Sequence, residues 1–261
     1  EFVRQEGQQC LAGTLNVDWQ DLDLSILRLE RIERFDIAKF AGKSGGNLTL
    51  EIFPDFHFRW NSRTRFDDLI VRRGEVSTPG KIDRLTVISK GEFDPVTGKL
   101  TLGRLDVSSS PLEISSTMTG RLDQNDFDLA TLDLDGRLDM AMVAALAPGL
   151  ARSLGEEGRI DGPCYFDFSW KDEPAGYQIE VHVNADGVFL DRPGTILKRA
   201  DDALNGSISI HTDQATWPWV VVDRVDFKVG QTELHGWGRL PPIRSGDDPD
   251  VWLDEVRRLA E

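Results

Sequence analysis

The stretch Cys164-Tyr165-Phe166-Asp167-Phe168-Ser169-Trp170 places a large apolar residue at every second position. Successive side chains of a β-strand point to opposite faces of the sheet. A period of two therefore puts Cys164, Phe166, Phe168 and Trp170 on one side of the strand and the residues between them on the other. The stretch predicts an amphipathic β-strand with one apolar and one polar face.

The same alternation recurs along the chain. Further runs are Leu48–Ile52, the trio Phe56, Phe58 and Trp60, the trio Ile179, Val181 and Val183, and the trio Val225, Phe227 and Val229. Turn-forming residues separate these runs. The loop Phe93–Lys99 carries Pro early and Gly late, and both Ala185-Asp186-Gly187 and Asn205-Gly206 are typical of tight turns. Short alternating runs bounded by such turns predict an antiparallel, all-β chain.

Two segments break the alternation. Met140–Pro148 is rich in Ala, and Asp139 before it is a suitable helix cap, so we expect a short helix there. Residues 247–261 begin with acidic residues and a Pro and then carry Trp252, Val256 and Leu259 at helical spacing. This pattern predicts a C-terminal acidic amphipathic helix.

A short repeat suggests how the strands are arranged. Gly-Arg-Leu begins at Gly103, Gly120, Gly136 and Gly238. We interpret it as a recurring hairpin in which the glycine eases a bend or bulge, and repeated units favour extension over closure. The predicted fold is a curved, repeating antiparallel sheet, an open groove or half-pipe over residues 1–246, followed by the helix of 247–261. A subdivision near 139–163, at the short helix, stays open. So does the alternative of a closed sandwich or barrel, since both need alternating strands.

The composition limits the partners. The 261-residue chain has a net charge of −15, with 45 acidic and 30 basic residues. Nucleic acid and anionic headgroups would be repelled by such a surface. No run of 18 apolar residues occurs, so no segment is expected to span a bilayer. The chain starts mid-pattern at Glu1-Phe2, so we expect a piece of a longer protein. Cys10 and Cys164 lie far apart, and two unpaired thiols are the expected state.

No catalytic, metal or cofactor site is predicted. His57, His182, His211 and His235 lie in alternating runs without a second His or Cys at ligand spacing. The carboxylates alternate with apolar residues, as outward positions of strands do, and no Gly-x-Ser-x-Gly elbow occurs. We therefore expect a non-enzymatic protein without metal or cofactor.

Four segments carry a likeness to a known family. They are a strand leading into an Ala/Leu helix over Leu132–Leu146, Gly158–Pro163 before the strand Cys164–Trp170, the run Val221–Gly230, and the run Leu234–Leu240. Over roughly residues 80–240 the chain resembles the AsmA-like superfamily of bacterial envelope proteins, which includes TamB-type and YhdP-type members. The C-terminal acidic helix has no counterpart in this pattern.

The resemblance implies a location and a role. Such proteins have an inner-membrane anchor, here expected only outside this chain, followed by periplasmic β repeats that form a groove. They are implicated in phospholipid transport between the membranes and in outer-membrane assembly. The expected partner is therefore a phospholipid or other acyl-chain lipid. Our candidates for the groove floor are Phe56, Phe58, Trp60, Phe166, Phe168, Trp170, Val181, Val225 and Phe227.

Two rival functions remain beside lipid binding. The first is an envelope scaffold in which a closed β-domain pairs its exposed strand edges with partner proteins. The second is a carbohydrate-binding sandwich that uses Trp217, Trp219 or Trp237.

Overall fold

The computed structural model describes residues 2–5, 8–27, 37–73, 80–123, 127–146, 158–174, 176–192, 194, 196–212 and 220–240. The strands of its large sheet are β3 (Gly13–Asp23), β4 (Ile37–Ile52), β5 (Phe58–Arg73), β6 (Gly80–Asp94), β7 (Lys99–Ser109), β8 (Leu112–Leu122), β9 (Phe127–Asp139), β11 (Pro163–Glu173), β12 (Gly176–Asn184), β15 (Leu204–Thr212), β16 (Val220–Val229) and β17 (Thr232–Leu240). The other elements are β1 (Phe2–Gln5), β2 (Gln8–Leu11), the 3-10 helix η1 (Leu24–Leu27), α1 (Met140–Leu146), β10 (Arg159–Asp161), β13 (Phe189–Arg192) and β14 (Ile196–Lys198).

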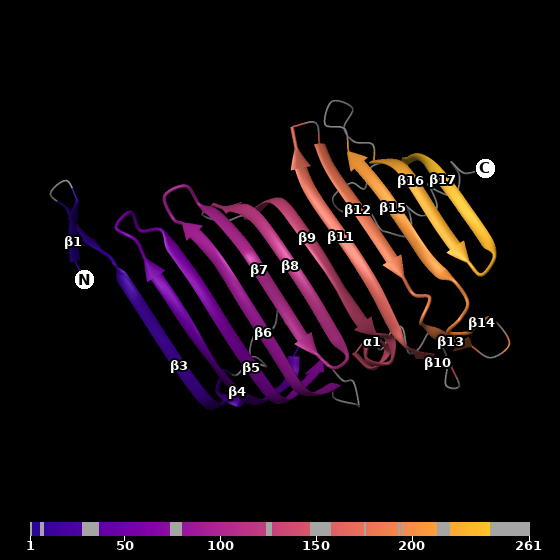
Figure 1. Cartoon of the computed structure of the whole chain (residues 1–261), viewed down its shortest axis with the longest axis horizontal. Coiled ribbons are helices and arrows are strands. Elements are labelled where there is room, and N and C mark those ends of the chain that lie inside the picture. Colours follow the sequence, from indigo (N-terminus) through magenta and orange to yellow (C-terminus); the bar gives the residue numbers. More distant parts are fainter. Residues whose placement is uncertain are drawn as a thin grey trace.

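The large sheet is a meander. Its twelve strands are hydrogen-bonded in the order β3-β4-β5-β6-β7-β8-β9-β11-β12-β15-β16-β17, which is the order of the sequence. All eleven pairings are antiparallel, and the strands follow one another across Figure 1 from the N-terminal to the C-terminal end. Between β9 and β11 the chain forms α1 and β10, and between β12 and β15 it forms β13 and β14. The three short strands pair in the order β10-β13-β14, while β1 and β2 form a separate hairpin.

Local chemistry produces the turns. After β6, the Oδ1 atom of Asp94 accepts a hydrogen bond of 2.9 Å from the Val96 backbone N–H, and Oδ2 accepts one of 2.7 Å from the Thr97 hydroxyl. Gly98 then adopts a φ of 72°, which a residue without a Cβ tolerates, and β7 begins at the next residue. This confirms the hairpin predicted for Phe93–Lys99.

The predicted short helix is also confirmed. The Oδ1 atom of Asp139 accepts hydrogen bonds from the backbone N–H groups of Ala141, at 3.0 Å, and Met142, at 3.4 Å. Asp139 thus caps α1 and satisfies N–H groups that have no partner within the helix. The chain then returns to the sheet at β11, which pairs directly with β9.

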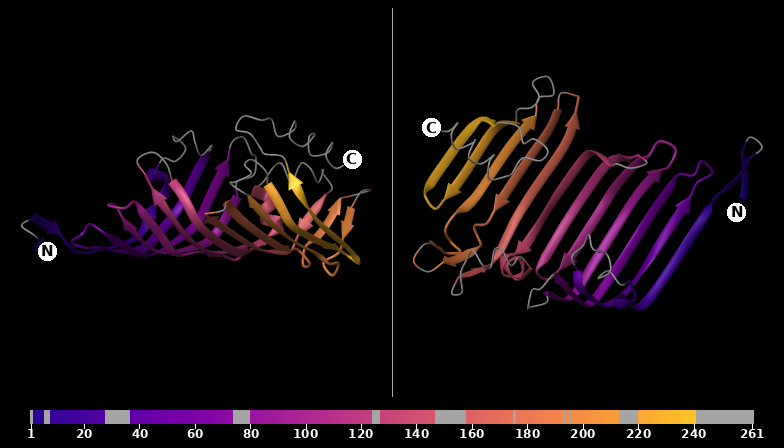
Figure 2. Two further views of the ribbon diagram at one scale, coloured as in Figure 1. Left: turned by 90° about the horizontal axis from the view of Figure 1, so that it is seen from above. Right: turned by 180° about the vertical axis from the view of Figure 1, so that it is seen from behind.

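The sheet is open and curved, as expected from the repeat. Figure 2 shows the coloured ribbon as one curved layer, with β3 and β17 at opposite ends. Bulges interrupt the register at several points, including Leu102/Leu105 and Val222/Val225, and such bulges increase twist and bending. The closed sandwich or barrel is therefore not the structure.

A single layer has little interior. Across the described ranges, the buried apolar residues are Leu24, Leu69, Ala185, Val188 and Val222. They come from η1, from β5, from β16 and from the turn that follows β12, so they do not form one sealed core. Most apolar side chains of the sheet are only half-buried.

Two local predictions were wrong. Phe56 does not belong to a strand: it lies in the turn between β4 and β5, where its N–H donates to the Phe53 carbonyl and its φ is 65°. Asn205-Gly206 is not a turn but lies inside β15. The predicted helix of 247–261, the side chain of Cys10, and Trp217 and Trp219 lie outside the described residues.

Candidate functional site

One row of side chains crosses the entire large sheet. Residues directly opposite each other on paired strands share a face. Followed from β3 to β17, the register joins Leu15, Leu50, Trp60, Gly91, Leu102, Met118, Leu132, Trp170, Ile179, Ile210, Val222 and Gly238. Every member of this transverse row is apolar or glycine. At the usual spacing between strands, the row is about 50 Å long.

A second row runs beside it on the same face. Two positions along most strands, and three along β7 and β16 where bulges intervene, the register joins Val17, Leu48, Ser62, Ser89, Leu105, Ser116, Leu134, Phe168, Val181, Ile208, Val225 and Gly236. This neighbouring row is apolar except for three serines, all of them between β5 and β8. We call the surface formed by these two rows and their same-side neighbours the apolar face.

The opposite surface, which we call the polar face, has the reverse character. Its corresponding row is Thr14, Glu51, Arg59, Glu92, Thr101, Thr119, Thr131, Lys171, Gln178, His211, Val221 and Arg239. Ion pairs link neighbouring strands here. The Arg59 Nε–H donates to Glu92 Oε1 at 2.8 Å, and a second nitrogen of the same guanidinium lies 3.4 Å from Glu51.

Aromatic rings cover glycines on the apolar face. A Cβ placed on Gly46 would lie 2.8 Å from the Trp19 ring, and one on Gly206 would lie 2.5 Å from the Phe227 ring. The same relation joins further pairs: Trp60 with Gly91, Phe127 with Gly120, and Phe166 with Gly136. Each ring thus lies over a gap left by a missing side chain on the adjacent strand, which flattens the surface.

Two tryptophans have internal hydrogen-bond acceptors. The Trp19 Nε1–H donates to the Ser44 hydroxyl at 3.0 Å, and the Trp60 Nε1–H donates to the Ser89 hydroxyl at 2.9 Å. In both cases the neighbouring strand carries Ser-x-Gly, as Ser44-Gly45-Gly46 and Ser89-Lys90-Gly91. The glycine accommodates the ring and the serine accepts from the indole.

The exposure of the apolar face changes along the sheet. Near the two ends its side chains are open to solvent: Leu15 is 52% exposed, Phe227 45% and Leu234 58%. The central strands carry mainly half-buried side chains. Cys164, a free thiol opposite Leu138, lies on this face, and burial raises its pKa. A raised pKa makes the thiol a weaker nucleophile at neutral pH.

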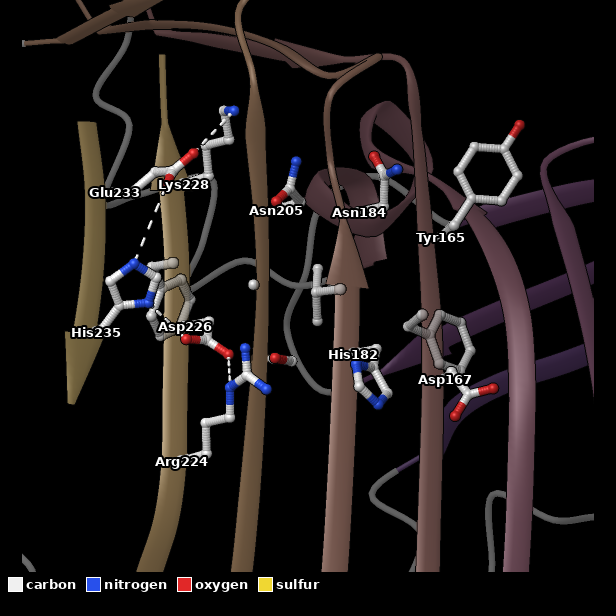
Figure 3. A pocket seen from close by; sticks show the side chains of 15 residues that line it. Tyr165, Asp167, His182, Asn184, Asn205, Arg224, Asp226, Lys228, Glu233 and His235 are labelled. Atoms are coloured by element: carbon white, nitrogen blue, oxygen red, sulfur yellow. Dashed lines mark hydrogen bonds and ion pairs between the residues drawn. The ribbon is translucent and has the colours of Figure 1, made fainter. Parts of the chain in front are cut away.

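The polar face has a hollow of about 540 Å³ near its C-terminal end (Figure 3). His182 lies opposite Asp167 there, while the Asp226 carboxylate accepts a 2.6 Å hydrogen bond from His235 Nδ1 and pairs with Arg224. His235 and Arg224 hold the pKa of Asp226 below its usual value. Five side chains of this exposed hollow pair with one another, namely Arg224, Asp226, Lys228, Glu233 and His235, so we regard it as surface structure.

The structure brings most of the predicted floor residues together. Phe58, Trp60, Phe166, Phe168, Trp170, Val181, Val225 and Phe227 all point to the apolar face by register. Phe56 does not, because it lies in a turn and is 50% exposed. Sequence reasoning missed several residues that lie between the predicted ones. Leu102, Met118 and Leu132 belong to the transverse row, and the alternation around each of them was the available signal.

Other kinds of site find no support among the described residues. No group of three His, Cys, Asp or Glu residues there could hold a metal ion, and no helix of the described ranges is long and apolar enough to cross a bilayer. Comparisons of the chain with protein-family models, with curated proteins and with solved structures found no match. The apolar face is therefore the candidate functional site.

Proposed function

We propose that this chain is a non-enzymatic module that holds or conducts lipid acyl chains on its apolar face. The observation that carries the proposal is the transverse row, which stays apolar across all twelve strands. In keeping with the AsmA-like resemblance, we place the module in the bacterial periplasm, as part of a protein anchored in the inner membrane. Its role there is phospholipid transport between membranes or outer-membrane assembly.

The energetics of apolar burial suit an acyl chain that moves along the apolar face. Burying a methylene group releases about 0.8 kcal/mol wherever the apolar surface is, so the binding energy depends on area and not on one specific contact. Because this surface stays apolar along about 50 Å, apolar contact can hold an acyl chain at every position along it. The rings that cover glycines support this by filling hollows that would otherwise interrupt the row.

The charges suit a carrier that meets water on its other side. The polar face carries the ion pairs, so a lipid on the apolar face leaves them hydrated. The net charge of −15 disfavours adsorption to anionic surfaces, which leaves the acyl chain as the part of the lipid that is recognised.

Mass spectrometry of organic extracts tests the proposal directly. We expect purified protein to contain co-purified acyl lipid, and delipidated protein to bind a fluorescent fatty acid. Bound lipid should also slow the alkylation of Cys164, which lies on the apolar face. Absence of lipid from the extracts together with absence of fatty-acid binding would overturn the proposal.

A matched pair of variants locates the binding surface. Phe168→Asn places an amide on the apolar face and should weaken fatty-acid binding about tenfold, because the amide must be desolvated. Ser169→Asn introduces the same amide on the polar face of the same strand and should leave binding unchanged. Equal effects of the two variants would contradict the assignment.

A second candidate is a scaffold that pairs its strand edges with partner proteins. The supporting observation is that β3 and β17 each have only one hydrogen-bonded neighbour among the described strands. Such edges can add a strand from another chain. This function predicts protein without co-purified lipid, and partner binding that Phe168→Asn leaves intact.

A further inference from the structure

Trp170, in the transverse row, lacks the indole hydrogen bond that two other tryptophans of the apolar face have. The Nε1–H of Trp170 is inaccessible to solvent and has no acceptor within the part of the chain that the structure describes. Trp19 and Trp60, on the same face, donate to Ser44 and Ser89. A buried donor without an acceptor is destabilising, so few such groups are retained in folded proteins.

The sequence of the neighbouring strand explains the difference. On β12, Tyr177-Gln178-Ile179 occupies the positions that Ser-x-Gly occupies beside Trp19 and Trp60. Ile179 stands in place of the glycine and Tyr177 in place of the serine. The Tyr177 ring contacts the indole of Trp170, with a distance of 4.7 Å between ring centroids and an interplanar angle of 33°.

Trp170 also marks a change of polarity along its strand. On the apolar face, β11 presents Cys164, Phe166, Phe168 and Trp170, and the next residue on that side is Asp172. The distance from Trp170 back to Cys164 is about 20 Å along the strand. Trp and Tyr side chains are favoured where one end of the ring meets apolar groups and the other meets polar ones.

We propose that the Trp170 Nε1–H donates a hydrogen bond to the acyl carbonyl oxygen of an ester-linked lipid whose chain lies over Phe168 and Phe166. The inference rests on the proposed function and adds a polar specificity to it. Rotation of the Tyr177 side chain away from the indole opens the path to the N–H. The carbonyl then lies where the apolar face ends, and the lipid headgroup lies beyond it near Asp172.

Two matched lipids isolate the carbonyl. An ester-linked phosphatidylcholine and its ether-linked analogue have the same headgroup and chain length, but only the ester has the carbonyl. We expect the wild-type protein to bind the ester three- to tenfold more tightly, the range of one net hydrogen bond. Trp170→Phe keeps an aromatic ring, removes the donor and should abolish this preference. In Trp60→Phe the preference should persist even if both affinities fall, because the Trp60 N–H already donates to Ser89.

A spectroscopic readout separates recognition from a merely structural role. With a ¹³C-labelled ester carbonyl, infrared spectra of bound lipid should show a hydrogen-bonded carbonyl band in the wild type that is lost in Trp170→Phe. Equal binding of ester and ether by the wild type would overturn the inference while leaving acyl-chain binding intact. A preference that survives in Trp170→Phe would overturn it as well. Failure of both lipids to bind would overturn the proposed function itself.

Discussion

Trp60 and Trp170 lie in the same transverse row, yet their surroundings differ. Beside Trp60 the neighbouring row supplies Ser89, which accepts the indole hydrogen bond. Beside Trp170 the apolar face presents Phe168, Ile179 and Tyr177, and the indole N–H has no acceptor among the described residues. Trp60 thus has its donor satisfied inside the sheet, whereas Trp170 leaves a donor for a ligand. One repeated strand pattern thus supports both a structural and a recognising tryptophan.

Adding a side chain at the glycine beneath the Trp60 ring should have the largest effect on stability. A Cβ at Gly91 would overlap the Trp60 ring and lie 2.7 Å from the Thr101 carbonyl oxygen. We expect Gly91→Ala to lower the free energy of unfolding by about 2 kcal/mol, since ring and backbone must both shift. Urea unfolding measures the change.

Gly238 provides the control for this variant. It belongs to the same transverse row, but its added Cβ would meet no atom within 4 Å. Gly238→Ala should stay within about 0.5 kcal/mol of the wild type. A similar loss in both variants would mean that glycine matters here for backbone flexibility and not for seating the ring.

Removing the acceptor of Trp60 should make it resemble Trp170. Ser89→Ala leaves the Trp60 N–H without its partner, which we expect to cost about 1 kcal/mol in urea unfolding. Ser62 lies directly opposite Ser89, and its hydroxyl has no hydrogen-bond partner in the described structure. Ser62→Ala should therefore have a smaller effect, and the reverse order would contradict the role assigned to Ser89.

The opposite change should remove the preference for ester lipid that we assign to Trp170. The double variant Tyr177→Ser/Ile179→Gly installs Ser-x-Gly beside it, as found beside Trp60. With an internal acceptor present, the preference for ester over ether lipid should fall by about threefold or more, while acyl-chain binding remains. Calorimetric titration with the two lipids measures this. An unchanged preference would show that the indole does not select the carbonyl.

Acid should remove a small contribution to stability from the polar face. His235 and Arg224 depress the pKa of Asp226, so the folded protein favours its ionised form. Its contribution is complete above the unfolded value of about 4 and is lost as pH falls through the lower, folded value. The stability difference between wild type and Asp226→Asn should therefore disappear in acid. Asp167→Asn removes no ion pair of the described structure and serves as the control. The same loss of the stability difference in acid for both variants would refute the assignment.

Alternation was sufficient to predict individual strands and their two faces, as Cys164–Trp170 within β11 illustrates. It failed at Phe56 because the turn chemistry of Pro54-Asp55 outweighs the period of two: the Asp55 carboxylate accepts from the His57 N–H, and the chain turns before β5. The turn predicted at Asn205-Gly206 was wrong because the glycine lies beneath Phe227, a contact between strands that local sequence does not reveal. The transverse row depends on the register of eleven strand pairs and on the bulges within them. No single segment contains that information, so only the structure reveals that the row is continuous.

The single layer has a consequence for how this molecule unfolds and evolves. Extensive contacts in the sheet join hydrogen-bonded neighbours, so each hairpin depends mainly on the hairpins beside it. Stability is then a nearest-neighbour property, as in solenoid proteins, and amide exchange should be fastest in β3 and β17 and slowest in the middle strands. Insertion or loss of one hairpin would change the row by about 10 Å and leave distant strands undisturbed. The length of the apolar face can therefore change by one hairpin at a time.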